Sequence, residues 1–205
     1  MPMFPLGTVL FPRAVLPLHV FEPRYRVLTR RCLEGDGEFG VVLIERGSEV
    51  GGGDQRSDVG TVARIVQAAE LPDGRFALVA TGIARLRVTR WLDDDPYPQA
   101  EVEIVAEPAS APGDERTRDA VLARLRTVSE LWRQIDASAP AAVPEVADDP
   151  LQASFELAAR APIGPFDAQR LLRAGAPSER LELLAEMLAE REQEFRARLA
   201  LDDGP

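Results

Sequence analysis

The sequence predicts an α+β protein, in which a β-rich lobe over residues 1–107 precedes a small helical bundle over residues 108–205. In the first lobe apolar residues form short runs or alternate with polar ones, as in strands. In the second they recur every three or four residues, as in helices. Between the lobes the composition changes abruptly at residues 107–113, a stretch rich in proline, alanine and glycine. Such a stretch is typical of a boundary between structural units.

The first three strands are predicted from apolar runs. Residues 4–10 and 16–21 are apolar and are separated by a Phe-Pro-Arg break at residues 11–13. Residues 39–44 form a continuous apolar run, which is typical of a strand covered on both faces.

A long hairpin and a last strand follow. Residues 61–71 and 75–81 flank Pro72-Asp73-Gly74, a tight-turn signal, and a glycine-rich loop is predicted before them over residues 51–58. Gly82 lies inside the second strand of the hairpin, which predicts a β-bulge or a close approach of another backbone segment. Residues 100–105 alternate apolar and polar side chains, so one face of this strand is expected to meet water.

One short helix is predicted between the second and third strands. Pro23 suits a first helical position, and Tyr25, Leu28 and Cys32 recur at helical spacing before Gly35, which suits the C-terminal cap. Several short strands with one helix among them favour a small closed or nearly closed barrel over a parallel βαβ sheet.

The second lobe is predicted to contain four helices. Val121, Leu125 and Val128 belong to the apolar stripe of the first, with Asp114 as its N-cap. Asp149 and Pro150 begin the second, which runs to about residue 161. The third and fourth helices are expected over residues 166–174 and from about residue 177.

Charge and composition exclude several classes of function. The net charge is -10, and both lobes are acidic, with 12 Arg and 16 acids in the first and 12 Arg and 18 acids in the second. A nucleic-acid partner is therefore not expected, because its phosphates need a cationic surface. The sequence has no apolar run long enough to span a bilayer and no secretory signal at its start. With a single cysteine, a cytoplasmic protein with no membrane partner is expected.

No set of catalytic or metal-binding residues can be assembled from the sequence. It contains no lysine, so a P-loop, whose lysine contacts the phosphates, is impossible. His19, the single histidine, lies in an apolar run and is expected to be a structural residue with one face packed, and Cys32 is expected to be buried and inert. Acidic pairs such as Asp148-Asp149 are expected to be solvated loop charges. We expect no enzyme activity, no cofactor and no metal.

Several short motifs resemble the N-terminal domain of Lon proteases. They are FPL at residues 4–6, VLFP at residues 9–12 and LPLHVFEPRYR at residues 16–26, with weaker likeness after residue 110. The resemblance implies a PUA-like β-barrel lobe followed by a helical lobe, which in Lon helps to recognise protein substrates. Lon would continue beyond Pro205 into an ATPase and a peptidase, so a stand-alone, non-catalytic domain is expected.

The function that this resemblance implies is binding of unfolded protein segments or of a protein partner, as an adaptor or regulator of proteostasis. An RNA-binding PUA-like module and a small-molecule-binding protein of unknown reaction remain as alternatives, and the acidic charge argues against the first. In the motif FEPRYR, Phe21 and Tyr25 are expected to pack into the barrel, and Glu22 to cap the helix or pair with an arginine. The candidate partner-binding residues are Tyr25, Arg26, Arg30, Trp91, Tyr97, Trp132 and Phe166.

Overall fold

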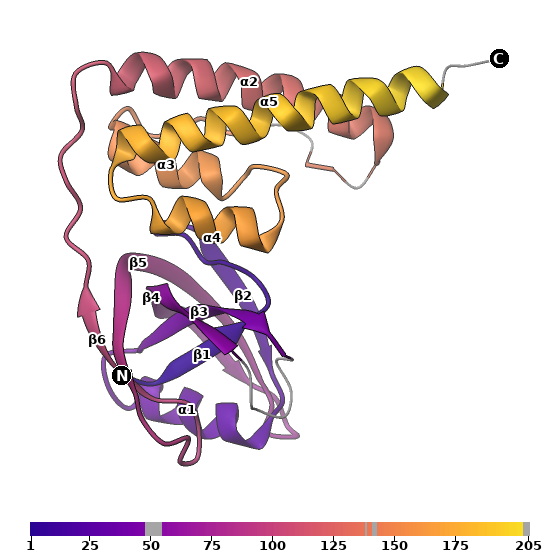
Figure 1. The fold of residues 1–205 in the computed structure, drawn as a ribbon. Helices are drawn as coiled ribbons and strands as arrows, with labels where there is room; N and C mark the ends of the chain where they lie inside the picture. Colours follow the sequence, from indigo (N-terminus) through magenta and orange to yellow (C-terminus); the bar gives the residue numbers. More distant parts are fainter. Residues whose placement is uncertain (48–54, 138, 141–142, 203–205) are drawn as a thin grey trace. The chain divides into compact units, whose positions relative to one another are not determined.

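A computed structural model describes residues 1–47, 55–137, 139–140 and 143–202. The chain divides into two compact units, Met1–Ala106 and Glu107–Pro205. The first contains a β-sheet and one helix, and the second is helical (Figure 1). The predicted α+β class is confirmed. Among the described residues, no helix is both long enough and apolar enough to cross a bilayer.

The first unit is a curled sheet with one helix. Its elements are β1 (Met3–Leu6), β2 (Val15–Val20), α1 (Pro23–Leu33), β3 (Glu38–Arg46), β4 (Gln55–Glu70), β5 (Phe76–Trp91) and β6 (Ala100–Ile104). The strand order is β1-β3-β4-β5-β2, and β6 also pairs with β5. Only β1 and β3 are parallel; the other pairs are antiparallel.

Curling of the sheet follows from the length of β5. Its first half pairs with β2 and its second half with β6, so the sheet bends between the two partners. Pro2 forms an isolated bridge with Gln99, and the Met3 amide donates to the Pro98 carbonyl at 2.8 Å. The beginning of β1 therefore contacts the segment before β6, and the sheet forms a half-barrel, as the barrel-like prediction required.

Gly82 in β5 is both a bulge and a close approach, as predicted. Val62 of β4 pairs with Ala84 and the next residue, Ala63, pairs with Gly82, so Ile83 is the extra residue of a bulge in β5. A Cβ at Gly82 would lie 2.3 Å from the Phe11 carbonyl oxygen. This position therefore accepts only glycine without a shift of the backbone.

Two strand boundaries that were predicted from the sequence of the first unit were wrong. β1 ends at Leu6 and not at residue 10. β4 begins at Gln55, so Ser57 and Asp58, which were predicted to lie in a loop, are strand residues and Ser57 is buried. The glycines at 51–53 lie outside the described residues.

Aromatic rings from β1 and α1 fill part of the core of the first unit. The rings of Phe4 and Tyr25 stack with centroids 4.1 Å apart, and the Phe39 ring lies 6.1 Å from that of Phe4. The prediction that Phe21 also packs inside was wrong, because its side chain is 56% exposed. Phe21 precedes α1, and the residues that helix directs inward begin with Tyr25.

The second unit consists of helices α2 (Asp114–Ile135), α3 (Pro150–Ala158), α4 (Pro165–Arg173) and α5 (Pro177–Asp202). Helices α2 and α5 are long and pack against each other (Figure 1). The predicted apolar stripe on α2 is buried at Val121, Leu125 and Val128. Asp149 caps α3 by accepting a hydrogen bond from the Leu151 amide at 3.3 Å, as predicted.

Asp114 is not the N-cap of α2. Gly113 occupies that position with a φ of +103°, which favours glycine, and Asp114 is the first helical residue. The Asp114 carboxylate instead accepts a hydrogen bond from the Ala111 amide at 2.7 Å. It therefore fixes the turn that leads into the helix.

A buried arginine on α5, Arg180, connects three segments of the helical unit. Its Nε donates to the Leu171 carbonyl at 3.0 Å, Nη1 to the Ser154 hydroxyl at 2.8 Å and Nη2 to the Ala174 carbonyl at 3.1 Å. The guanidinium also lies 3.8 Å from the centroid of the Phe155 ring. Since the side chain is 0% exposed, these partners supply the contacts that water would give a surface arginine.

Candidate functional site

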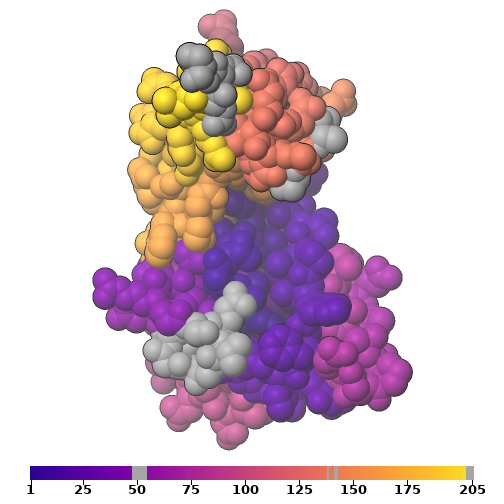
Figure 2. Space-filling view, turned by 90° about the vertical axis from the view of Figure 1, so that its right-hand side faces the viewer, coloured from indigo at the N-terminus to yellow at the C-terminus, as the bar shows by residue number. Residues whose placement is uncertain are grey.

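An apolar groove opens in the first unit between β1, β2 and the start of α1. We call it the β2 groove; its cavity volume is about 220 Å³. The residues that line it are Phe4, Leu6, Pro17, Leu18, His19, Val20, Phe21, Glu22 and Tyr25. In the space-filling view the N-terminal segment that supplies them (indigo) occupies the middle of this face of the first unit (Figure 2).

One edge of β2 borders the groove and is not paired with another strand among the described residues. Hydrogen-bonded positions alternate along an antiparallel pair. The Gly82 amide donates to the Ala14 carbonyl at 3.0 Å, which sets the phase of this alternation. Residues 16, 18 and 20 therefore direct their backbone polar groups to β5, and residues 15, 17 and 19 direct theirs to the unpaired edge.

Side chains along β2 alternate in the same way. Leu16 and Val20 are buried in the core, whereas Val15, Pro17 and His19 are exposed. The alternation places the His19 imidazole on the outer face of β2, where it is exposed although it lies in an apolar run. That one face of this histidine is packed stays a prediction. Val15 is 64% exposed, so the outer face of this strand also carries an apolar side chain.

Among the described residues that line the β2 groove, one is acidic, and its charge is balanced. The Glu22 carboxylate accepts a hydrogen bond from Arg24 Nε at 3.0 Å. Of the two roles predicted for Glu22, the structure supports the pairing, because no side-chain cap bond is formed at α1. The Arg24 guanidinium also lies 4.5 Å from the centroid of the Tyr25 ring. The groove is therefore apolar in its walls and neutral in charge.

Three candidate partner-binding residues lie on α1, and one of them lines the groove. Tyr25 is buried and forms part of the groove wall. Arg26 is half-buried, and its guanidinium lies against Gly74 in the β4–β5 turn. Arg30 is exposed and pairs with Glu70 of β4 at 2.6 Å, so it ties the helix to the hairpin.

Trp91 and Tyr97 lie elsewhere in the first unit. Trp91, at the end of β5, packs under the Arg56 guanidinium at 4.6 Å from the ring centroid. It lines a polar hollow of about 440 Å³ together with Glu45, Gln55 and Arg56. Tyr97 is buried in the core. Of the first unit's candidates, only Tyr25 therefore reaches the β2 groove.

Trp132 and Phe166 belong to the second unit. Trp132, on α2, is half-buried and lines a mostly apolar hollow of about 430 Å³ with Pro140, Val143 and Pro144 among its other walls. Phe166, on α4, is 62% exposed and does not line that hollow. The two residues therefore do not form one site within this unit.

Sequence reasoning missed the unpaired edge of β2 and the exposed ring of Phe21. A signal for the first was present, because proline inside a strand is confined to edge strands and bulges. Pro17 lies in β2, where its missing N–H faces the unpaired edge. No sequence signal distinguished Phe21 from its buried neighbours.

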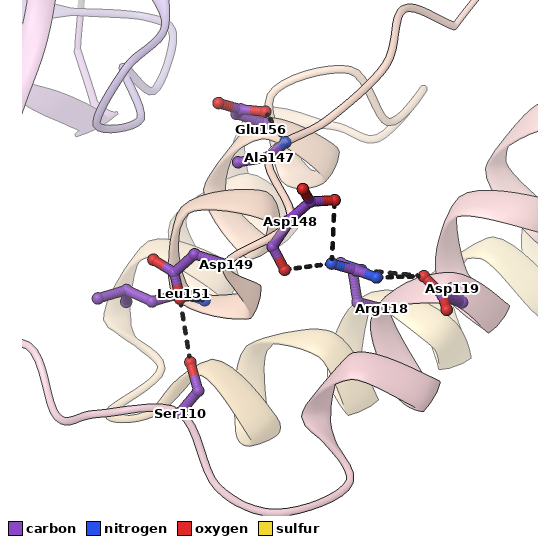
Figure 3. Close-up of polar contacts among 8 residues, drawn as sticks. All are labelled: Ser110, Arg118, Asp119, Ala147, Asp148, Asp149, Leu151 and Glu156. Carbon is purple, nitrogen blue, oxygen red and sulfur yellow. Dashed lines mark hydrogen bonds and ion pairs between the residues drawn. The ribbon is translucent and has the colours of Figure 1, made fainter.

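The acidic residues before α3 are held by an arginine of α2. The Arg118 guanidinium bonds to the Asp148 carbonyl oxygen and lies 2.7 Å from the Asp119 carboxylate (Figure 3). Ser110 contacts the Asp149 carboxylate at 3.4 Å, and Glu156 accepts from the Ala147 amide at 3.0 Å. Within the described ranges no group of three or more His, Cys, Asp or Glu side chains could hold a metal ion. This cluster positions the segment before α3.

Cys32 is buried on the inner face of α1, as predicted. Its thiol contacts the Glu38 carbonyl oxygen at 3.3 Å. Burial, and to a smaller extent the nearby Asp36 carboxylate, raise the pKa of the Cys32 thiol to about 11. The thiolate is therefore suppressed at neutral pH, which makes Cys32 a poor nucleophile.

Comparison with known proteins identifies the family. The family model described as the ATP-dependent protease La (LON) substrate-binding domain matches residues 1–190. The chain belongs to the Lon substrate-binding domain family. The resemblance inferred from residues 4–26 is thus confirmed over most of the sequence.

Individual Lon proteases and solved Lon domains are similar to this chain. Lon protease of Escherichia coli K12 is 29% identical over 199 residues, which cover 91% of this chain and 24% of the relative. Lon protease 2 of Myxococcus xanthus is 30% identical over 192 residues, covering 92% and 23%. The chain therefore spans about a quarter of the length of these proteases.

Two solved structures of Lon N-terminal domains support the fold. A Lon N-terminal domain protein from Xanthomonas campestris has a TM-score of 0.66 and 29% identity, and the match covers 90% of this chain and 95% of that one. The N-terminal domain of the Mycobacterium avium complex Lon protease has a TM-score of 0.66 and 18% identity, covering 92% and 97%. The second likeness establishes the fold alone.

Proposed function

We propose that this Lon-family domain binds unfolded or partly folded protein segments in the β2 groove. The observation that carries the proposal is an open apolar groove in which Glu22, the one acid among the described lining residues, is neutralised by Arg24. Unfolded chains differ from folded ones chiefly in exposing apolar side chains, and an apolar groove removes such side chains from water. A neutral groove does not select for charge, so it suits many substrates.

Exposed apolar side chains at the groove support the same function. Phe21 lines the groove and is 56% exposed, and Val15, at the other end of β2, is 64% exposed. Exposed large apolar side chains beside an apolar groove mark an interaction surface. Aromatic residues in such positions commonly contribute most to binding, so Phe21 is the anchor that we assign to the groove.

We further propose that the domain acts in the cytoplasm as an adaptor or regulator of proteolysis, without catalysis of its own. Membership of a family described as the substrate-binding domain of an ATP-dependent protease supports a role in presenting protein substrates. The residues assigned to the groove bind and orient apolar groups, and none of them forms a nucleophile–base pair.

Fluorescence anisotropy tests the proposal. A labelled test protein, kept unfolded by reduction and carboxymethylation, is titrated with the domain, and the same protein in its folded form is the control. We expect saturable binding of the unfolded form alone, weakened about tenfold or more by Phe21→Ala, since hot-spot aromatics lose about 2 kcal/mol or more on truncation. Absence of binding to the unfolded form would refute the proposal.

An RNA-binding role is the competing proposal, and charge argues against it. Both units are acidic, and the chain as a whole carries a net charge of -10. Filter binding of single-stranded RNA at low salt distinguishes the two. We expect no retention; binding that falls steeply with added salt would favour the RNA reading.

A further inference from the structure

We infer that the segment bound in the β2 groove is an extended strand that adds to the unpaired edge of β2. The inference rests on the proposed function and names its binding mode and the chemistry of the ligand. Strand addition supplies affinity through backbone hydrogen bonds, which every polypeptide can form, and side-chain pockets add selectivity.

Backbone groups along β2 provide the hydrogen bonds. Residues 15, 17 and 19 direct their polar groups away from β5, because the Gly82–Ala14 hydrogen bond fixes the alternation. Val15 and His19 each present an N–H and a carbonyl at this edge, and Pro17 presents a carbonyl alone. Within the part of the chain that the structure describes, these groups have no hydrogen-bond partner.

Groove and edge lie side by side, so one extended segment can contact both. Residues 17–20 of β2 supply both the edge and part of the groove wall, opposite Phe4 and Tyr25. Side chains of a strand point alternately to its two faces. An added strand would therefore place every second side chain on the groove side, where the lining is apolar and neutral. The ligand is a segment with uncharged apolar residues at alternate positions.

A second copy of this chain is a poorer occupant than an unfolded segment. A symmetric antiparallel pairing of two β2 edges would centre on Pro17, which would face Pro17 of the other copy. Neither proline has an N–H, so the central pair would lose both of its hydrogen bonds. An unfolded segment without proline at that position forms the bond to the Pro17 carbonyl that the second copy cannot.

N-methylated peptides test the inference, because N-methylation removes a backbone N–H without changing the side chain. The parent is a seven-residue peptide of alternating valine and threonine, labelled at one end. One derivative is N-methylated at the valines and the other at the threonines. We expect one derivative to bind at least about tenfold more weakly than the parent and the other to bind like it.

The derivative that fails reports the orientation of the added strand. We take the valine side chains to face the groove. If the peptide then pairs antiparallel to β2, the amides that face β2 belong to the threonines. If it pairs parallel to β2, they belong to the valines. Equal binding of parent and both derivatives would overturn the inference while leaving the proposed function intact. Failure of the parent peptide and of the unfolded test protein to bind would instead refute the proposed function.

A matched pair of variants tests the same edge from the side of the protein. His19→Pro removes an outward N–H and leaves the bonds to β5, as Pro17 already does two residues earlier. His19→Ala keeps the N–H and is the control. We expect about tenfold weaker peptide binding for His19→Pro alone. Equal affinities for both variants, or sedimentation as a dimer that His19→Pro dissociates, would overturn the inference.

Discussion

Replacing Arg180 by alanine is expected to destabilise the helical unit more than any exposed arginine does. The side chain is fully buried and donates to Ser154, Leu171 and Ala174 at 2.8–3.1 Å. Its removal takes the charged donor from all three partners at once. The guanidinium also leaves the face of the Phe155 ring, which creates a cavity beside that ring.

The magnitude follows from what the partners retain. The Ser154 hydroxyl keeps the Leu151 carbonyl as its acceptor at 2.7 Å, so its loss is partial. The Leu171 carbonyl likewise keeps the Ala174 amide as a donor at 3.3 Å, so its loss is also partial. For the Leu171 and Ala174 carbonyls together we take about 1–3 kcal/mol. The stacked contact with Phe155 adds about 1 kcal/mol. We therefore expect Arg180→Ala to lower the free energy of unfolding by about 2–4 kcal/mol.

Urea unfolding followed by far-ultraviolet circular dichroism measures this change. Arg170→Ala is the matched control, because Arg170 is exposed on α4 and, among the described residues, its ion pair is with Asp167 across the helix surface at 3.1 Å. That control is expected to change the free energy of unfolding by less than about 0.5 kcal/mol. If Arg180→Ala unfolds at the same urea concentration as the control, the buried network does not stabilise the unit and the reasoning fails.

Two further predictions concern the first unit. Gly82→Ala places a Cβ 2.3 Å from the Phe11 carbonyl oxygen and is expected to lower the free energy of unfolding by about 1–3 kcal/mol, measured by urea unfolding. Gly35→Ala is the control, because its Cβ would meet nothing closer than 3.7 Å, and it is expected to be nearly neutral. For Cys32, burial raises the thiol pKa from 9.0 to about 11, so its stabilising contribution is present below pH 9 and is lost as the pH rises through 11. Between pH 9 and 11 the free energy of unfolding of the wild type should therefore fall more steeply with pH than that of Cys32→Ala, measured by urea unfolding. The same pH dependence for both proteins would contradict the raised pKa.

Much of the fold could be predicted because local signals and burial agree. Helix α1 begins at Pro23 and buries Tyr25, Leu28 and Cys32, the residues that recur at helical spacing in the sequence. The bulge at Gly82 was predictable because a glycine inside a strand signals a close backbone approach. The helix depends on residues near each other in the sequence, and the glycine marks the bulge by its own identity, although Phe11, the residue that it approaches, is distant in sequence.

The remaining features depend on contacts between distant segments. Arg180 looks like any helical arginine in the sequence, and its burial follows from the packing of α5 against α3 and α4. Whether Phe21 and His19 face the core or the solvent depends on the phase of β2, which its pairing with β5 sets. The β2 groove likewise exists only because β1 and β2, nine residues or more apart in sequence, face each other across Tyr25.

Amide hydrogen exchange of β2 tests the central claim most directly. The exchange of the Val15 and His19 amides is measured in the free protein and with saturating unfolded test protein, and the folded form of that protein is the control. These two N–H groups face the unpaired edge, so we expect both to exchange more slowly with the unfolded form alone. If the unfolded protein binds while both amides exchange as in the free protein, substrate segments do not bind along β2.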